Sequence, residues 1–249
     1  MENILITGAS RGIGRAIALR LAGRNCNLFI NSSGVSQQLE ETEILASEIK
    51  RNASVSGNVF RFKADVSDPS AVREMFGYIS GKTAGGNIDI LVNNAGISHI
   101  GLVQDVTDDI WDRMIGVNLS SVHYCCRAAV PHMIAHGRGR IINISSVWGC
   151  CGASCEVAYS ASKGGVNAYT KALAKELAPS GIAVNAIACG CIDTGMNDHL
   201  NAAEKEELCA SIPAGRFSSA DEVAELVDAM CDQSLYLTGQ IIGFDGGWI

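Results

Sequence analysis

Short apolar runs alternate along the chain with longer segments that have the 3.6-residue spacing of amphipathic helices. The apolar runs predict strands at Asn3–Thr7, Asn27–Asn31, Val59–Ala64, Ile88–Val92, Arg140–Ile144, Ala183–Ala188 and Gln240–Phe244. The helical spacing predicts helices at Gly12–Ala22, Ser36–Arg51, Pro69–Lys82, Thr107–His136 and Val157–Ala178. Because strands that are apolar throughout are buried on both faces, this alternation predicts a doubly wound α/β fold with a seven-stranded parallel sheet between two layers of helices.

The chain is predicted to form one domain over residues 1–249, since no Pro/Ser-rich linker, internal repeat or low-complexity segment divides it. The segment Gly190–Phe217 departs from the alternation, with a polar helical stretch, Asn201–Ala210, between glycines and a proline. An insertion of this size after a strand end is typical of a substrate lid. The alternative is a surface excursion without function.

Composition excludes several classes of protein. The 249 residues are 47% hydrophobic and 18% charged, which supports a packed core and excludes a disordered chain, a collagen or a coiled coil. The net charge of −7 argues against sequence-independent nucleic-acid binding, which needs clustered Lys and Arg. It leaves room for an anionic ligand, because backbone N–H groups at a helix N-terminus can hold a phosphate.

The chain is expected to be a cytoplasmic protein with no membrane contact. No apolar run reaches the ~18 residues of a membrane-spanning helix, and the N-terminus lacks the basic region of a signal peptide. The ten cysteines include no CxxC pair and no Cys/His set with zinc spacing, so no metal site is expected. We expect reduced, mostly buried thiols that act as small apolar residues.

The first predicted strand runs directly into the sequence TGASRGIG at residues 7–14, immediately before a helix. Glycines here allow a tight turn and let a pyrophosphate approach the backbone. The helix N-terminus adds free N–H donors and a positive dipole end. The position of this loop therefore predicts a dinucleotide site.

The loop spacing resembles the TGxxxGxG fingerprint of the short-chain dehydrogenase/reductase superfamily, whose members are single-domain Rossmann-fold enzymes. The resemblance continues along nearly the whole chain, with Asp65-Val66 after the third strand, the sequence NNAG at 93–96, and a Tyr-x3-Lys pair at 159 and 163. The resemblance implies nucleotide contacts at Gly8, Ser10, Arg11, Gly12, Ile13, Gly14, Asp65, Val66, Asn93, Ala95, Gly96, Tyr159, Lys163, Ile192 and Thr194.

Tyr159 and Lys163 stand at positions i and i+4, so they share one helix face. An unperturbed phenol has a pKa of ~10, which is too high for ready proton exchange near neutrality. A neighbouring ammonium favours the phenolate, so the spacing predicts a lowered pKa for Tyr159 and a role in general acid/base chemistry.

Ser145 and Ser146 compete for one hydroxyl role, and alternation along a strand places them on opposite faces. The family has its serine thirteen residues before the tyrosine, which selects Ser146. In the mechanism that the resemblance implies, Ser146 hydrogen-bonds the substrate carbonyl and Tyr159 donates the proton. Lys163 binds the nicotinamide ribose and tunes Tyr159, while Asn118 positions water for a proton relay.

One position departs from the family pattern. Cys189 stands where the family has a proline after the sixth strand, which loosens the backbone at that turn. A packing role for Cys189 is favoured over redox sensitivity. Ile192 and Thr194 still match positions that contact the nicotinamide amide.

The end of the second strand bears on the choice of cofactor. An NAD enzyme of this kind usually has an Asp or Glu there, and the segment 26–33 has none. Arg11 is placed to pair with a 2′-phosphate, and Asn31 and Ser32 to hydrogen-bond to it. The sequence therefore predicts NADP(H).

For the substrate, the chain looks most like the bacterial 3-oxoacyl-[acyl-carrier-protein] reductases of fatty acid biosynthesis, which implies an acyl carrier protein as partner. The stretch 146–159 also resembles the reductase of 5-aminopentanone-modified elongation factor P. Glu156 would there pair with a substrate ammonium; the alternative is that Glu156 caps the following helix. Two further alternatives stay open: steroids or other small ketones as substrates, and a protein that binds the dinucleotide without turnover. The presence of Asn118, Ser146, Tyr159 and Lys163 argues against the second of these.

The resemblance also implies a homodimer or homotetramer. Two features are compatible with it: the predicted helix around Ser121–His136 is more apolar than one buried side requires, and the chain ends in Trp248-Ile249. The alternative is that this helix is deep in the sheet packing and that the tail folds over its own subunit.

Overall fold

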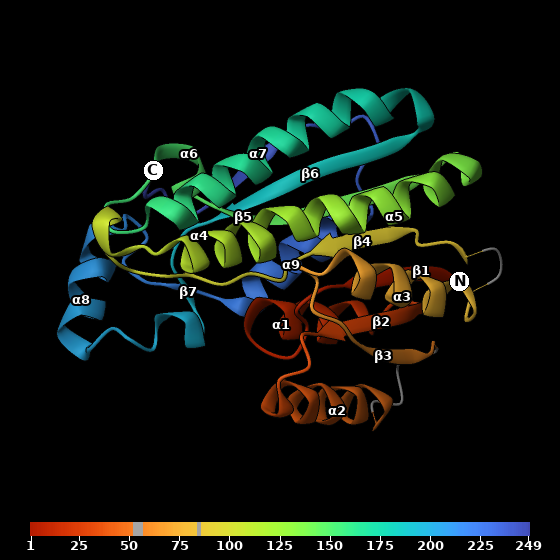
Figure 1. The fold of residues 1–249 in the computed structure, drawn as a ribbon, viewed down its shortest axis with the longest axis horizontal. Coiled ribbons are helices and arrows are strands. Elements are labelled where there is room, and N and C mark those ends of the chain that lie inside the picture. The colour runs from red at the N-terminus through yellow and green to blue at the C-terminus, as the bar shows by residue number, and fades with distance from the viewer. Residues whose placement is uncertain (52–56, 84–85) are drawn as a thin grey trace.

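A computed structural model of the chain describes residues 1–51, 57–83 and 86–249. Within these residues, seven parallel strands form one twisted sheet in the order β3-β2-β1-β4-β5-β6-β9, with helices on both faces (Figure 1). This confirms the predicted doubly wound Rossmann fold. The strands are β1 (Glu2–Ile6), β2 (Cys26–Ser32), β3 (Val59–Lys63), β4 (Ile90–Asn93), β5 (Gly139–Ser146), β6 (Ile182–Cys189) and β9 (Ile241–Phe244).

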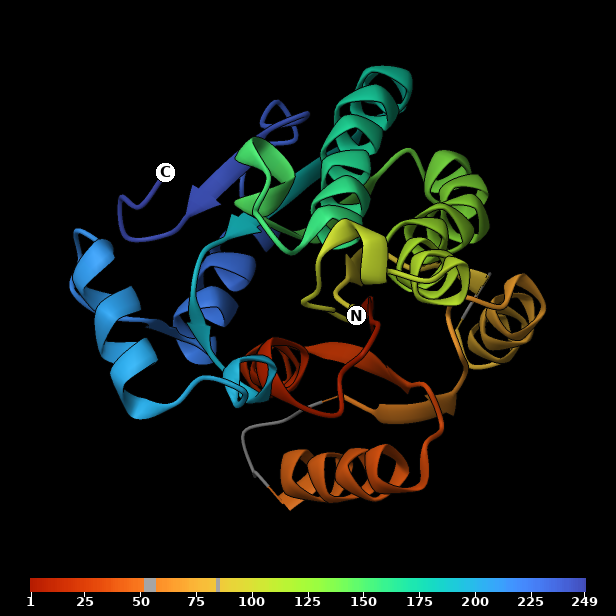
Figure 2. The same ribbon diagram turned by 60° about the vertical axis from the view of Figure 1, so that its left-hand side comes forward.

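Side chains that alternate along each strand supply two separate cores. Ile4 and Ile6 of β1 pack under one layer of helices, and Leu5 between them packs under the other. The first layer is α1 (Gly12–Leu21), α2 (Ser36–Arg51) and α9 (Ala220–Cys231); the second is α3 (Pro69–Ser80), α5 (Ser121–His136) and α7 (Val157–Leu177). Figure 2 shows the two layers on opposite sides of the sheet.

The sequence pattern missed α9. This helix begins with a capping box, in which Ser219 and Glu222 exchange side-chain and backbone hydrogen bonds, and it buries Val223, Val227 and Met230. Both signals are visible in the sequence, as a Ser-x-x-Glu followed by apolar residues at helical spacing. The short helix α6 (Trp148–Cys151) was missed too.

The predicted helix over Thr107–His136 is interrupted. It is α4 (Asp108–Ile115), a π-helical turn over Gly116–Ser120, and α5. A π turn adds a residue to the helical repeat, and such turns are frequent at functional sites. Here the turn contains Asn118.

The segment over Gly190–Phe217 stands apart from the main sheet, as the sequence indicated. It contains β7 (Ile192–Asp193) and α8 (Ala202–Ser211), and β7 pairs with β8 (Ser218–Ser219), which closes the excursion. In Figure 1, α8 lies at the side of the molecule, outside the two helical layers. Its role as a lid stays a prediction.

The ten cysteines are all free thiols. Cys26, Cys125, Cys126, Cys189 and Cys231 are buried, so the expectation of mostly buried thiols holds for half of them. Cys150 and Cys151 on α6 are exposed, although the Cys150 sulfur accepts a hydrogen bond from Nδ2 of Asn167 on α7 (3.5 Å). Of the helices in the described ranges, none combines the length and the apolar character that crossing a bilayer requires.

Candidate active site

The site lies at the carboxyl ends of β1 and β4, which are neighbours in the sheet. Successive strands are added on one side of β1 up to β3 and on the other side from β4 onward, and ligands of doubly wound folds bind at this switch point. Asn94, which follows β4, ties the two strand ends together. Its side-chain amide donates to the carbonyls of Thr7 and Gly8 (2.9 Å each), and its backbone N–H donates to Thr7 Oγ1 (3.0 Å). Asn94 was not among the predicted site residues, although the sequence NNAG contains it.

The glycine loop has the close packing that a nucleotide cradle needs. Gly8 and Gly12 have φ values of +64° and +54°, which few other residues adopt. A Cβ atom at Gly14 would lie 2.3 Å from the carbonyl oxygen of Gly8 and 2.4 Å from Nδ2 of Asn94. A side chain here would therefore displace the carbonyl of Gly8 and the amide of Asn94, so the loop keeps this path only with glycine at position 14.

The end of β2 fits an additional phosphate only in part. The Ser32 hydroxyl is buried and has no hydrogen-bond partner in the described part of the chain, and Arg11 is exposed and ion-pairs with none of the described residues. Both groups are thus free for a ligand. Lys63, paired with Ser32 across β2 and β3, packs its side-chain stem on Gly34 and adds a cation that the sequence interpretation missed.

Asn31 does not have the free side chain that the sequence prediction required. Its Oδ1 accepts from the backbone N–H of Gly8 (3.3 Å), and its Nδ2 donates to the carbonyls of Ser32 (3.2 Å) and Ala64 (3.0 Å). The side chain therefore braces the glycine loop against β2 and β3, and the predicted hydrogen bond from Asn31 to a 2′-phosphate is corrected to this positioning role.

The next three predicted nucleotide residues have their side chains engaged within the protein. The carboxylate of Asp65 accepts from Ser67 and from Nη1 of Arg113 (2.7 Å); burial alone would raise the pKa of Asp65, but these partners hold it below its ordinary value. Val66 packs in the core, and the amide of Asn93 donates to Oδ1 of Asn143 (2.9 Å). For Val66 and Asn93, nucleotide contact stays a prediction for the backbone.

Tyr159 and Lys163 project from the first turns of α7 and are both buried. The Lys163 Nζ atom lies 5.8 Å from the centroid of the Tyr159 ring and donates to the carbonyl of Ile144 at the end of β5 (2.8 Å). Burial lowers the pKa of Lys163 to about 8. The ammonium therefore stays charged at neutral pH but loses its proton more readily than an exposed lysine.

The predicted fall in the pKa of Tyr159 is wrong for this structure. Burial raises the pKa of the phenol above its ordinary value, a hydrogen bond with Ser146 opposes the rise, and the negative charge of Glu156 adds to it. Desolvation of the buried phenol is the largest cause, and Lys163, whose Nζ atom lies 5.8 Å from the centroid of the Tyr159 ring, does not reverse it. Tyr159 is thus protonated at neutral pH, the form that can donate a proton.

The two serines at the end of β5 are separated by strand alternation, as predicted. Ser145 Oγ donates to Oδ1 of Asn167 on α7 (2.6 Å), inside the protein. Ser146 is paired with Tyr159, and its Oγ also accepts from the backbone N–H of Trp148 (3.2 Å). The geometry therefore brings Ser146, and not Ser145, to the tyrosine.

Asn118 reaches the same place through the π turn. Its amide exchanges two hydrogen bonds with the backbone of Ile97 (2.8 and 2.9 Å) and also donates to Oγ of Ser162 (3.0 Å). A Cβ atom at Gly96 would lie 3.5 Å from both Oδ1 of Asn118 and Nζ of Lys163. Gly96 thus leaves open the space where these two polar groups meet.

The remaining predicted residues border this space from the lid side. Thr194 contacts the position of a Cβ atom at Gly12 (3.5 Å), and Ile192 is buried at the start of the lid segment. Cys189 is buried and packed in the core, and burial raises its thiol pKa to about 12, which agrees with a packing role. Glu156 occupies the N-cap position of α7, but its side chain makes no capping hydrogen bond.

The chain's C-terminal tail folds onto its own subunit near the site. Trp248 packs on Trp148 of α6, with ring centroids 4.9 Å apart, and Figure 1 shows the C-terminus beside α6. Asp245 fixes this turn by accepting from the backbone N–H groups of Gly247 (2.9 Å) and Ile249 (3.2 Å). Both tryptophans were missed as site residues, because nothing in the sequence connects positions 100 residues apart.

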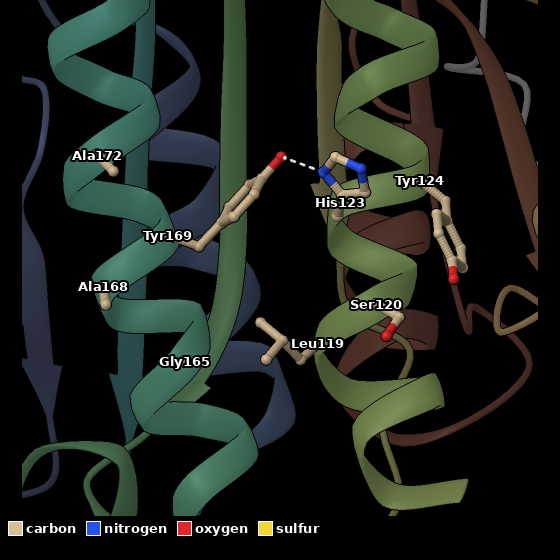
Figure 3. A pocket seen from close by; sticks show the side chains of 8 residues that line it. All are labelled: Leu119, Ser120, His123, Tyr124, Gly165, Ala168, Tyr169 and Ala172. Atoms are coloured by element: carbon tan, nitrogen blue, oxygen red, sulfur yellow. Dashed lines mark hydrogen bonds between the residues drawn. The ribbon is translucent and has the colours of Figure 1, made fainter. Parts of the chain in front are cut away.

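A groove of about 600 Å³ lies between α5 and α7, and no predicted site residue lines it. Figure 3 shows His123 of α5 and Tyr169 of α7 pointing toward each other across it, with 3.4 Å between Nδ1 and the hydroxyl oxygen. Its other lining residues are Leu119, Ser120, Tyr124, Gly165, Ala168 and Ala172. Elsewhere, the described ranges contain no group of three or more His, Cys, Asp or Glu side chains arranged to hold a metal ion.

Comparison with known proteins identifies the family to which this chain belongs. The family profile described as short chain dehydrogenase matches residues 2–205. The 3-oxoacyl-[acyl-carrier-protein] reductase FabG of Staphylococcus aureus is 39% identical over 247 residues, which cover 99% of this chain and 97% of that protein. FabG of Thermotoga maritima is 39% identical, over 98% of this chain and 96% of that protein. The uncharacterized oxidoreductase YmfI of Bacillus subtilis is 38% identical, over 99% of this chain and 98% of that protein. The chain therefore belongs to the short-chain dehydrogenase family and is an oxidoreductase acting on CH–OH or C=O groups.

Proposed function

We propose, from the chain's membership of the short-chain dehydrogenase family, that it is an NADPH-dependent carbonyl reductase whose first candidate substrates are 3-oxoacyl thioesters. The observation that carries the proposal is the meeting of Ser146, Tyr159, Lys163 and Asn118 beside the glycine loop. A protein that only binds a dinucleotide has no need of a buried proton donor there.

Each residue has a separate role in this proposal. When bound, the reduced nicotinamide supplies a hydride to the carbonyl carbon. The protonated Tyr159 donates its proton to the carbonyl oxygen, and the Ser146 hydroxyl donates a hydrogen bond to the same oxygen. Lys163 holds the ribose hydroxyls, and Asn118 orders the backbone of Ile97 and the polar space beside Gly96 through which the proton of Tyr159 is replaced.

The preference for NADPH rests on the end of β2. Arg11 and the unpartnered hydroxyl of Ser32 are free, and Lys63, which is paired with Ser32 across β2 and β3, is a further cation. We expect the Michaelis constant for NADPH to be at least about tenfold below that for NADH, as a charge-assisted pair with a phosphate implies. Arg11→Ala should remove most of this difference, whereas Arg15→Ala, which removes a cation paired with Glu48, should not. Equal use of both nucleotides by the wild type would refute the proposal.

The thioester substrate is supported by the relatives named as 3-oxoacyl-[acyl-carrier-protein] reductases, whose similarity covers nearly the whole chain. The test is NADPH oxidation with acetoacetyl thioesters of pantetheine and of an acyl carrier protein. Turnover of both, faster with the protein-bound form, supports this candidate. Turnover of simple ketones without any turnover of the thioesters excludes it.

A second candidate, reduction of 5-aminopentanone-modified elongation factor P, is supported by Glu156. The alternative explanation for this residue is a favourable interaction of its charge with the N-terminus of α7, where Glu156 is the N-cap residue without a side-chain capping hydrogen bond. A half-buried carboxylate near Tyr159 suits a substrate ammonium, which a thioester does not have. Reduction of the modified factor in the absence of thioester turnover would favour this candidate.

Assembly into a homodimer or homotetramer and a cytoplasmic location complete the proposal. The groove between α5 and α7 and its rim of Leu119, Tyr124 and Tyr169 support a helix-to-helix interface between two copies. Ten free thiols support a reducing compartment. Light scattering at micromolar concentration tests the assembly, and a mass of 26.2 kDa would refute it.

A further inference from the structure

The carboxylate of Asp65 stands one residue from the brace of the glycine loop. The carbonyl of Ala64 accepts from the side-chain amide of Asn31 (3.0 Å), whose oxygen accepts from the N–H of Gly8 (3.3 Å). The N–H of Ala64 donates to the carbonyl of Ser32 (3.0 Å). Asp65 therefore follows β3 at the same edge of the sheet as the glycine loop. Its side chain is 38% exposed, so a ligand bound at this edge has access to the carboxylate.

Three donors within the chain hold this carboxylate. Its Oδ1 atom accepts from the backbone N–H and from the hydroxyl of Ser67 (3.0 and 2.7 Å). Its Oδ2 atom accepts from Nη1 of Arg113 on α4 (2.7 Å), and the same nitrogen donates to the hydroxyl oxygen of Ser67 (2.6 Å). A carboxylate has about four acceptor positions. One position on Oδ2 is therefore left for a donor that a ligand supplies.

Arg113 projects from a helix that is anchored in the catalytic cluster. Met114, the next residue of α4, is buried and packs in the apolar cluster that contains Tyr159. The Met114 sulfur accepts a hydrogen bond from Nδ2 of Asn118 (3.0 Å). Since these contacts fix α4 from the side of the reacting groups, the guanidinium of Arg113 reaches the carboxylate of Asp65 from a fixed base.

The turn after β3 is held by contacts of its own. The N–H of Asp68 donates to the carbonyl of Asp65 (3.0 Å), and Asp68 is the N-cap residue of α3. Gly116 ends α4, and a Cβ atom there would lie 3.4 Å from the Cβ atom of Ser67. The end of α4 thus lies directly against this turn, and the two segments that hold the carboxylate support each other.

We propose that Arg113 is a positioning residue for the adenine of the nucleotide, because it holds the Asp65 carboxylate with Oδ2 free to accept from the exocyclic amine. The inference rests on the proposed binding of NADPH and on the nucleotide contact that the resemblance implies for Asp65. It adds a residue of α4 that the predicted site did not contain. A fixed carboxylate accepts from an amine and repels a carbonyl oxygen at the same position, whereas a carboxylate that turns freely finds another donor. Arg113 therefore sets how strictly the site requires a 6-aminopurine.

Binding is measured first, without turnover. The probes are NADPH and its deamino analogue, in which hypoxanthine replaces adenine and a carbonyl oxygen stands in the place of the amine. The fluorescence of the reduced nicotinamide gives both dissociation constants in the absence of a ketone. We expect the wild type to bind NADPH at least about tenfold more tightly than the analogue. Equal affinity of the wild type for the two nucleotides would overturn the inference.

Variants of Arg113 then test its part in this preference, as the ratio of the two dissociation constants. Arg113→Met should lower the ratio at least about fivefold, because Asp65 keeps its charge but loses the donor that fixes Oδ2. Arg113→Lys, which keeps a cationic donor, should retain most of the ratio. Arg73→Met removes an exposed arginine that donates to Ser70 on α3 (2.7 Å), and this charge control should leave the ratio unchanged. A wild-type ratio in Arg113→Met would refute the positioning role.

A double variant tests whether Arg113 acts through Asp65. An amide can accept from an amine or donate to a carbonyl, so Asp65→Asn should bind the two nucleotides about equally. Adding Arg113→Met to this variant should leave the ratio unchanged, because the group that Arg113 positions is gone. A further change in the ratio would show that Arg113 contacts the purine itself, and would refute the positioning role.

Turnover separates this inference from the proposed function. NADPH oxidation with ketones is followed in the wild type and in Arg113→Met at saturating NADPH. If the substitution removes the purine preference but neither enzyme reduces a ketone, the reductase function fails and the positioning role stands. If both enzymes reduce ketones and the preference is the same in both, the reductase function stands and the positioning role fails.

Discussion

Replacing Gly14 by alanine tests whether the tight packing of the glycine loop is what holds the nucleotide. Gly14 lies in the first turn of α1, where its backbone is helical, so alanine brings no φ strain. The added Cβ atom would lie 2.3 Å from the Gly8 oxygen and 2.4 Å from Nδ2 of Asn94. Since ordinary contacts begin near 3.4 Å, these atoms must retreat by about 1 Å.

The cost follows from what the two atoms do. Overpacking of this kind costs about 1–3 kcal/mol. The retreat strains the hydrogen bonds from Asn94 to Thr7 and Gly8, which contribute about 0.5–1.5 kcal/mol each. Alanine recovers up to about 1 kcal/mol of helix preference over glycine. We expect a net loss of about 1–3 kcal/mol in the free energy of unfolding.

The affinity for NADPH should fall more than the stability does. A displacement of about 1 Å in a site that positions a ligand costs up to about 10²-fold, so we expect at least about a tenfold rise in the dissociation constant. Nucleotide fluorescence measures the affinity, and urea denaturation of the apoprotein measures the stability.

Gly77→Ala is the matched control. Gly77 lies in α3, and nothing is within 4 Å of the position of its Cβ atom. This variant should gain up to about 1 kcal/mol of stability and bind NADPH normally. If Gly14→Ala kept both the affinity and the stability of the wild type, the cradle interpretation would be wrong.

Three further predictions concern the residues around Tyr159. Tyr159→Phe removes only the proton donor, so steady-state assays should show less than about a tenth of the wild-type kcat and an unchanged NADPH affinity. This fall in kcat corresponds to a loss of more than ~1.4 kcal/mol of transition-state stabilisation. Higher activity would exclude Tyr159 as the donor. Ser146→Ala should lose most of its activity. Ser145→Ala should keep its activity and lose about 1–3 kcal/mol of stability, because Oδ1 of Asn167 loses its hydrogen-bond donor in the interior. The reverse pattern would exchange the two roles. Lys163 is charged below its pKa of about 8 and neutral above it, so the affinity of the free enzyme for NADPH should fall as the pH rises through 8. This pH dependence should vanish in Lys163→Met. An identical pH profile in the variant would show that another group titrates.

Local pattern was sufficient for the sheet and most of its helices. All seven predicted strands of the main sheet lie within two residues of the observed bounds, because a buried parallel strand needs a continuous apolar run and each run is bounded by polar residues or glycine. The glycine loop and the shared helix face of Tyr159 and Lys163 also follow from local information. Strand alternation separates Ser145 from Ser146, but the choice of Ser146 came from the family's spacing between its serine and its tyrosine.

Only the tertiary structure decided which polar side chains keep a donor or acceptor that is free to bind a ligand. Asn31 lies where the sequence indicated, but its amide is hydrogen-bonded to the glycine loop, to Ser32 and to the end of β3, so the free group is the Ser32 hydroxyl beside it. The direction of the Tyr159 pKa shift depends on burial, which is the sum of contacts from elements far apart in the chain. The position of Trp248 against Trp148 depends on how the tail after β9 packs on α6. Periodicity reports which face of an element is buried, whereas hydrogen-bond partners and desolvation are set by the residues that pack on that face, and these come from other parts of the sequence.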